Sequence, residues 1–266
     1  MSIIEILGYI GALLVGVVLG LIGGGGSILT VPVLVYFFYL NPVTATAYSL
    51  FVVGSSALVG ALRNMQKNLV VFKTAFVFAG PALVMVFVTR KFIIPAIPEQ
   101  LFSIGGLLIT KSLAIMVFFA IIMLLASVTM IRNRKPEKEQ VALNPANHAL
   151  LVIQGIVIGF ITGMVGAGGG FLIIPALVIL AKLPMKKAVA TSLFIIAINS
   201  LIGFTGDISN ITIDWSFLFL FTVLSIIGIF IGIWLNKFFD GKRLKKAFGW
   251  FVLVMGIYII YKELFS

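Results

Sequence analysis

Two glycine-rich stretches hold the residues of this chain that are best suited to binding chemistry. They read GLIGGGGSILTVP at residues 20–32 and GMVGAGGGFLIIP at residues 163–175, at a constant offset of 143 (163 minus 20, and 175 minus 32). Helix-compatible apolar sequence follows each stretch, and the first turn of a helix has backbone amides without intrahelical partners and a partial positive charge. Glycine also lets a ligand approach the backbone closely and adopts the positive φ that turns successive N–H groups toward one point. A small anion is therefore the expected ligand. The candidate binding residues in the two stretches are Gly23, Gly24, Gly25, Gly26, Ser27, Gly166, Gly168, Gly169 and Gly170.

Hydroxyl and amide side chains follow each glycine stretch and are candidates for contacting the oxygens of such an anion. They are Ser49 in the first half of the chain and Thr191, Ser192 and Asn199 in the second. Structural roles compete with this interpretation. Glycines can serve tight helix packing alone, and Ser or Thr can bond to a carbonyl one turn earlier in its own helix. The matched register favours binding for the glycines and leaves both explanations open for Ser49 and Ser192.

The offset of 143 extends beyond the glycines. It also relates Ser49-Leu50-Phe51 to Ser192-Leu193-Phe194, and Gly16 to Gly159. Internal repetition of this kind is typical of membrane transporters built from two copies of one unit. We predict a first membrane repeat at residues 1–131, a basic cytoplasmic linker at 132–147 and a second repeat at 148–266.

Composition indicates an integral membrane protein. Of the 266 residues, 61% are hydrophobic and 10% are charged, against about 25% charged in soluble domains. Apolar runs of helical length recur throughout, which predicts an all-α polytopic protein rather than a barrel. There is no cysteine, which excludes disulfides and thiol chemistry. The first apolar run lacks the basic leader of a secretory signal, and we expect it to be retained.

The apolar segments number ten, five in each half. They cover residues 3–22, 27–39, 43–61, 69–89, 101–131, 148–165, 171–181, 188–205, 213–235 and 247–264. If every segment crosses the bilayer, the basic links all lie on one side, with 15 of the 19 Lys and Arg residues. The positive-inside rule makes that side cytoplasmic. These charges therefore report orientation, and we expect no nucleic-acid partner.

With five crossings per half, the two repeats are inverted relative to each other. Segments 27–39 and 171–181 are shorter than the roughly 20 residues that span a bilayer. If the two segments that flank each glycine stretch formed one interrupted crossing, Lys182, Lys186 and Lys187 would lie outside, against the positive-inside rule. Hairpins that dip into the membrane would keep every charge assignment. Two topologies therefore stay open: one with ten crossings, and one with six crossings and two hairpins.

Other polar residues offer little chemistry by pattern. Residues 113–131 can span alone, so we expect Lys111 at the outer interface, with Asp207 and Asp214 facing water in a short outer link. His148 is the only histidine, and no cluster of His and carboxylates has the spacing of metal ligands. We expect no metal, no cofactor and no catalytic residue.

The chain resembles the sulfite exporter TauE/SafE family of bacterial membrane proteins. The resemblance covers nearly the whole chain and rests on the twin glycine turns, on Gly166-Ala167-Gly168-Gly169-Gly170, and on Thr191-Ser192-Leu193. In the first half Ser27 replaces the last glycine, and Tyr48-Ser49-Leu50 stands where the second half has Thr191-Ser192-Leu193. The resemblance implies a secondary transporter in the cytoplasmic membrane that exports sulfite or organosulfonates.

From the residues alone, the expectation is an inverted-repeat transporter for a small anion. An anion channel and a non-transporting membrane subunit are the alternatives. An intramembrane enzyme is disfavoured because the sequence has no Ser-His, paired-carboxylate or metal arrangement. A coupling ion such as a proton and the oligomeric state stay open.

Overall fold

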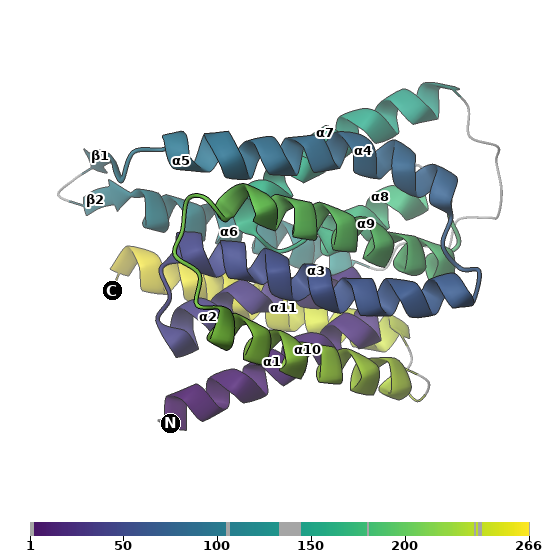
Figure 1. The fold of residues 1–266 in the computed structure, drawn as a ribbon, viewed down its shortest axis with the longest axis horizontal. Helices are drawn as coiled ribbons and strands as arrows, with labels where there is room; N and C mark the ends of the chain where they lie inside the picture. The colour runs from purple at the N-terminus through teal and green to yellow at the C-terminus, as the bar shows by residue number, and fades with distance from the viewer. Residues whose placement is uncertain are drawn as a thin grey trace.

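The protein is a bundle of helices that run roughly along one common direction (Figure 1). The computed structural model describes residues 3–104, 107–132, 145–179, 181–236, 238 and 241–265. In chain order the helices are α1 (Ile3–Ile22), α2 (Thr30–Phe38), α3 (Pro42–Gln66), α4 (Phe72–Val88), α5 (Ile94–Ala96), α6 (Lys111–Ile131), α7 (Pro145–Val165), α8 (Gly170–Ile179), α9 (Met185–Asp207), α10 (Trp215–Leu235) and α11 (Gly241–Phe265). A 3-10 helix, η1 (Gly24–Leu29), precedes α2, and a π-helical turn, η2 (Thr89–Ile93), joins α4 to α5. The all-α polytopic class is confirmed.

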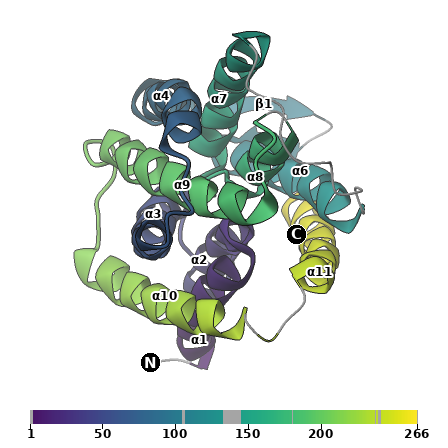
Figure 2. The same ribbon diagram turned by 90° about the vertical axis from the view of Figure 1, so that its right-hand side faces the viewer.

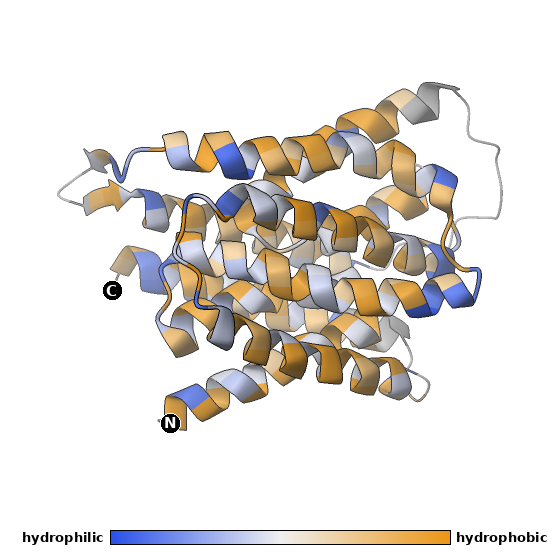
Figure 3. Ribbon diagram, in the orientation of Figure 1, coloured by the Kyte–Doolittle hydropathy of each residue, from blue (hydrophilic) through white to orange (hydrophobic). Residues whose placement is uncertain are grey.

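Most of the helices have membrane-spanning length. Within the described residues, seven stretches are long and apolar enough to cross: α1, α3, the run Phe72–Ala96, α6, α9, α10 and Lys246–Phe265 of α11. Large apolar side chains such as Phe219, Phe230 and Val254 are exposed on the outside of the bundle. Hydrophobic residues extend along the helices, whereas hydrophilic residues concentrate near their ends (Figure 3). This is the distribution of a protein surrounded by hydrocarbon.

The glycine stretches interrupt the helical path once in each half. After α1 the chain passes through η1 into the nine-residue α2, and after α7 a turn leads to the ten-residue α8. At 1.5 Å per residue, α2 and α8 are each about 15 Å long, roughly half the thickness of the hydrocarbon core. Both short segments predicted from the sequence are therefore present as short helices.

Helix pairing follows the internal repeat. Helix α1 packs on α10, and α7 packs on α4 (Figure 2). In the repeat α1 corresponds to α7 and α10 corresponds to α4, so these two contacts are equivalent. The corresponding pairs α3 with α9 and α6 with α11 pack on each other. Individual contacts obey the same exchange: Gly16 lies against Ser225, and Gly159 lies against Ala82. Because 16 and 159, like 82 and 225, differ by 143, the repeat seen in the sequence is also a repeat of packing.

The direction of the helices differs between the halves. Helix α3 runs from left to right in Figure 1, whereas α9 runs from right to left. The α3–α4 connection, the start of α9 and the end of α10 all lie at the right-hand end of the bundle. The links predicted to be cytoplasmic therefore adjoin one end, although residues 133–144 of the predicted linker lie outside the described part of the chain. The inverted orientation across a bilayer stays a prediction.

One predicted helical segment begins differently. Residues 101–131 do not form one helix, because β1 (Gln100–Ile104) and β2 (Leu107–Thr110) pair as an antiparallel hairpin before α6. The sequence between the strands is Gly105-Gly106, which favours a tight hairpin turn over a helix. Thr110 then caps α6, since its Oγ1 accepts a hydrogen bond of 3.3 Å from the Leu113 amide.

Candidate functional site

The two glycine stretches meet inside the bundle. A Cβ added to Gly24 would collide with the backbone of Gly170, and one added to Gly170 would collide with the backbone of Gly24. Both residues are buried. The breaks in the two halves therefore form one structural unit, as expected if both contribute to a single site.

Several of these glycines are required by their backbone conformation. Gly23, Gly166, Gly168 and Gly169 have φ of 78°, 72°, 64° and 67°. These values lie in the left-handed region, which side-chain-bearing residues seldom adopt. Close packing adds a second requirement, because Gly26 lies against the backbone of Leu19. The packing role weighed against binding is thus real, and it accounts for much of the glycine content.

The second break is enclosed by α3 and α9. Gly166 lies against the backbone of Thr46, and a Cβ on Gly168 would lie 2.8 Å from Val53 Cγ1 and 3.1 Å from Ser200 Oγ. Residues 46, 49 and 53 share one face of α3, because they are separated by three and four positions. Ser49 therefore lies on the α3 face that packs against this break.

Three of the predicted binding residues use their hydroxyls within the protein. Ser27 Oγ donates to the Gly24 carbonyl and Ser192 Oγ donates to the Val189 carbonyl, both at 2.8 Å. Thr191 Oγ1 accepts a 3.0 Å hydrogen bond from the Val71 amide just before α4. For these three side chains the structure supplies the local bonds that compete with ligand binding.

Other buried polar atoms have no partner among the described residues. Ser49 Oγ and Asn199 Oδ1, both predicted from the sequence, belong to this group. Thr30 Oγ1 and Ser200 Oγ join them and were not predicted. Buried polar atoms without a bond are costly, so such a group near the glycine breaks indicates a place where a polar ligand can be accepted.

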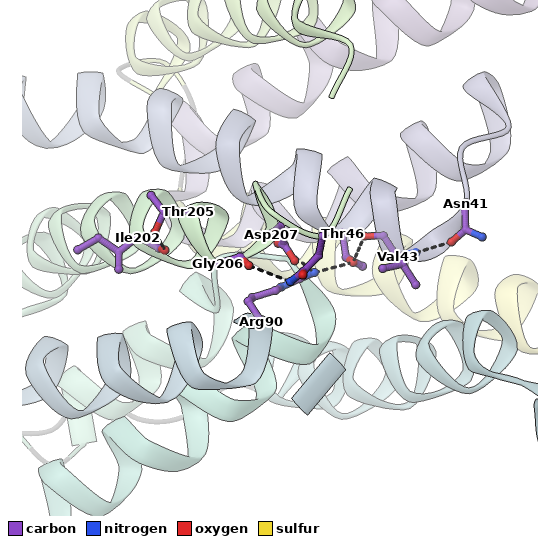
Figure 4. A network of polar contacts seen from close by, with 9 residues as sticks. Asn41, Val43, Thr46, Arg90, Ile202, Thr205, Gly206 and Asp207 are labelled. Atoms are coloured by element: carbon purple, nitrogen blue, oxygen red, sulfur yellow. Dashed lines mark hydrogen bonds and ion pairs between the residues drawn. The ribbon is translucent and has the colours of Figure 1, made fainter. Parts of the chain in front are cut away.

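A buried ion pair lies at one side of this region (Figure 4). Arg90 Nη1 is 3.5 Å from Asp207 Oδ2 and donates to Thr46 Oγ1 at 3.1 Å. The Arg90 side chain is 0% exposed and that of Asp207 is 3% exposed. The expectation that Asp207 faces water was wrong, because α9 extends through Asp207 and packs against η2, which carries Arg90. Asp214, in contrast, is exposed and caps α10 through the Phe217 amide.

A cavity of about 300 Å³ opens beside this ion pair at the end of the bundle that includes the hairpin. Its lining residues are Asn41, Val43, Ile94, Pro95, Glu99, Lys111, Asp207, Asn210 and Ile211. Lys111 Nζ lies 3.8 Å from Glu99 Oε1. Lys111, which was expected at the outer interface, is the first residue of α6, and its side chain is only 8% exposed. The surrounding protein encloses it, which the length of the apolar run could not reveal.

The family model described as "Sulfite exporter TauE/SafE" matches residues 9–259. The chain belongs to the TauE/SafE family. A probable membrane transporter protein of Xylella fastidiosa (strain 9a5c) is 30% identical over 94% of this chain and 92% of its own length. The probable membrane transporter protein YunE of Bacillus subtilis is 26% identical over 96% of both chains. No solved structure gives a significant match.

This TauE/SafE protein is accordingly a multi-pass protein of the cell membrane and a transporter rather than an enzyme. The family match confirms the resemblance identified from the glycine motifs. In the described part of the chain, no group of three or more His, Asp or Glu side chains could hold a metal ion.

Arg90 is a further candidate site residue that was not predicted from the sequence. A signal for it was present: Arg90 and Lys111 are two of only four basic residues on the side predicted to be outer, where the positive-inside rule disfavours them. A basic residue that persists against this rule is a candidate for a role inside the protein. Its partner Asp207 could have been suspected because it directly follows a long apolar run.

Proposed function

We propose that this TauE/SafE protein transports small sulfur-containing anions, sulfite or organosulfonates, through a site at the meeting point of the two glycine breaks. The family description supports the sulfur anion. The proposed location of the site rests on the contact between Gly24 and Gly170, because this contact brings both breaks into one buried region. Export is the direction that the family description favours.

The chemistry near the breaks suits an anion of this size. Helix α8 begins at Gly170, and the first turn of a helix carries a partial positive charge equivalent to roughly half an elementary charge. Ser49, on the adjoining face of α3, adds a buried hydroxyl with no partner among the described residues. Such a site would hold an oxyanion by several weak donors, which allows release as well as binding.

The two repeats provide the means of opening the site to each side of the membrane in turn. Residues 1–131 and 148–266 form the two units of our proposal, and α3 packs on α9 where they meet. Inverted-repeat transporters alternate access by moving one repeat against the other around a fixed central site. In this proposal the close contact of Gly24 with Gly170 lets the two units move past each other without side chains in between.

Flux into proteoliposomes tests the proposal. Purified protein would be reconstituted, and uptake of sulfite, methanesulfonate and 2-hydroxyethanesulfonate compared with that of chloride, acetate and phosphate. Uptake would be measured with and without an imposed proton gradient. We expect saturable uptake of the sulfur anions only, at rates below those of a channel. Equal uptake of chloride with no saturation would support an anion channel instead, and equal rates in protein-free liposomes would contradict transport of these anions.

A further inference from the structure

Arg90 has few hydrogen bonds for a buried arginine. Its side chain is 0% exposed, yet the hydrogen bond and the ion pair that it forms with the described residues are both made by Nη1, with Thr46 Oγ1 at 3.1 Å and Asp207 Oδ2 at 3.5 Å. Nε and Nη2 are buried and have no hydrogen-bond partner there. These two nitrogens form one edge of the planar guanidinium, and that edge presents two parallel N–H donors.

A free guanidinium edge has a defined ligand preference. Two parallel N–H groups match two oxygens of one planar or tetrahedral oxyanion, such as a carboxylate, sulfonate or phosphate. A buried cation whose donors stay unpaired is costly, so its surroundings favour a ligand that supplies oxygens. Asp207 satisfies only part of this demand, because its carboxylate stands 3.5 Å from Nη1 and Oδ2 makes no hydrogen bond to a described residue.

The position of Arg90 connects the cavity with the glycine breaks. Asp207 lines the cavity, and Arg90 lies next to Asp207. Arg90 bonds Thr46, whose backbone packs against Gly166 in the second break. An anion that enters from the cavity therefore reaches Asp207 and Arg90 before it reaches the glycines.

We propose that the Nε/Nη2 edge of Arg90 binds the oxygens of the transported anion, and that Asp207 is the counter-ion that Arg90 keeps when no anion is bound. The proposal rests on the proposed function for the identity of the anion, a sulfite or sulfonate group. It changes the character of the site, because a full positive charge then adds to the helix dipoles. Asp207 repels the incoming anion and competes with it for the same guanidinium.

A purely structural ion pair is the alternative. Arg90 and Asp207 join η2 to α9, and such a tie could serve only to fix these two elements. The two explanations differ in the sign of one effect. A structural tie is damaged by neutralising either partner, whereas a binding site loses affinity when Arg90 is neutralised and gains affinity when Asp207 is neutralised.

Anion binding to the purified full-length protein in detergent separates them. Calorimetric titration and anion-dependent shifts of the unfolding temperature would be measured with sulfite, methanesulfonate, phosphate and acetate. The variants are Arg90→Gln, Asp207→Asn and the double variant Arg90→Gln/Asp207→Asn, which leaves no unpaired buried charge and so guards against a folding defect. Lys91→Gln is the matched control, because the exposed Lys91 is the next residue and carries the same charge.

We expect roughly 10- to 150-fold weaker sulfite or sulfonate binding in Arg90→Gln and in the double variant, the loss typical of a charge-assisted hydrogen bond. Asp207→Asn should bind more tightly than wild type, and Lys91→Gln should match it. Wild-type affinity in the double variant would overturn the assignment of Arg90 as a binding residue. It would not contradict the sulfur anion as the substrate. Arg90-dependent binding of phosphate or acetate alone would support the Arg90 site and contradict the sulfur specificity. No binding of any anion, even by Asp207→Asn, would overturn the site.

Discussion

Gly24 and Gly170 lie backbone against backbone, although they belong to different halves of the chain. Neither residue has space for a Cβ, because the obstacle is main chain rather than the flexible end of a side chain. The contact joins η1 to the start of α8 and places both breaks in one interior region.

This contact predicts a steep response to small substitutions. Gly24→Ala and Gly170→Ala should each destabilise the protein by about 1–3 kcal/mol, the usual cost of overpacking, and should abolish or strongly reduce flux. Gly80→Ala is the control, because no described residue beyond the adjoining turns of its own helix lies within 4 Å of a Cβ there. The measurements are thermal unfolding in detergent and uptake into proteoliposomes. Unchanged flux in both variants would show that transport does not depend on the close contact between the two breaks.

Ser49 and Ser192 are equivalent in the repeat but should respond differently. Ser49 Oγ is unpartnered among the described residues, whereas Ser192 Oγ already donates to the Val189 carbonyl. Ser49→Ala should raise the apparent substrate constant roughly 10- to 150-fold if its hydroxyl bonds the anion. Ser192→Ala should change it much less. Concentration-dependent uptake measures both, and the reverse order would move the site to the α9 side.

Thr191 should prove structural. Its Oγ1 accepts a hydrogen bond from the Val71 amide, which precedes α4. Thr191→Val should therefore cost about 1 kcal/mol of stability, and Thr191→Ser should restore most of it, with the substrate constant unchanged in both. Thermal unfolding and uptake assays give the two readouts. A large change in the substrate constant of Thr191→Ser would instead assign this residue to the ligand.

Lys111 and Glu99 should influence entry from the cavity with opposite signs. Both line the cavity, and their charged groups lie 3.8 Å apart. Lys111→Gln should slow uptake of an anion from this side and Glu99→Gln should accelerate it, because charges at the mouth of a site steer ions toward it. Both effects should shrink at high ionic strength. Initial rates at 20 and 300 mM salt test this, and identical rates in the two variants would exclude steering.

The topology can be mapped because the natural chain has no cysteine. Single cysteines at the exposed positions Lys67 and Lys186 should react with impermeant maleimide only from the cytoplasmic side. Cysteines at the exposed positions Glu99 and Ser209 should react only from outside. The basis is the concentration of Lys and Arg in the links at one end of the bundle. Lys67 and Ser209 lie in corresponding links of the two repeats, so labelling of both from one side would reject the inverted orientation.

The membrane class, the repeat and the positions of the helices could be predicted from the sequence. These features depend on local composition and on spacing, since an apolar run of about 20 residues forms a helix in a bilayer whatever its neighbours are. The offset of 143 likewise identified which segments of the two halves are equivalent, such as α1 with α7 and α3 with α9. The hairpin before α6 was missed because its apolar residues continue into the apolar run of the helix that follows.

The electrostatic character of the candidate site was decided by the tertiary structure alone. Arg90 and Asp207 are 117 positions apart in the sequence (207 minus 90), and each stands at the end of an apolar segment, where a charge usually meets water. Only the packing of η2 against α9 removes both from solvent and brings them to 3.5 Å. Burial is a property of what surrounds a side chain, and for residues at helix ends the surroundings come from distant parts of the chain. For the same reason, Ser49 and Ser192 have the same place in the repeat but different bonds in the folded protein.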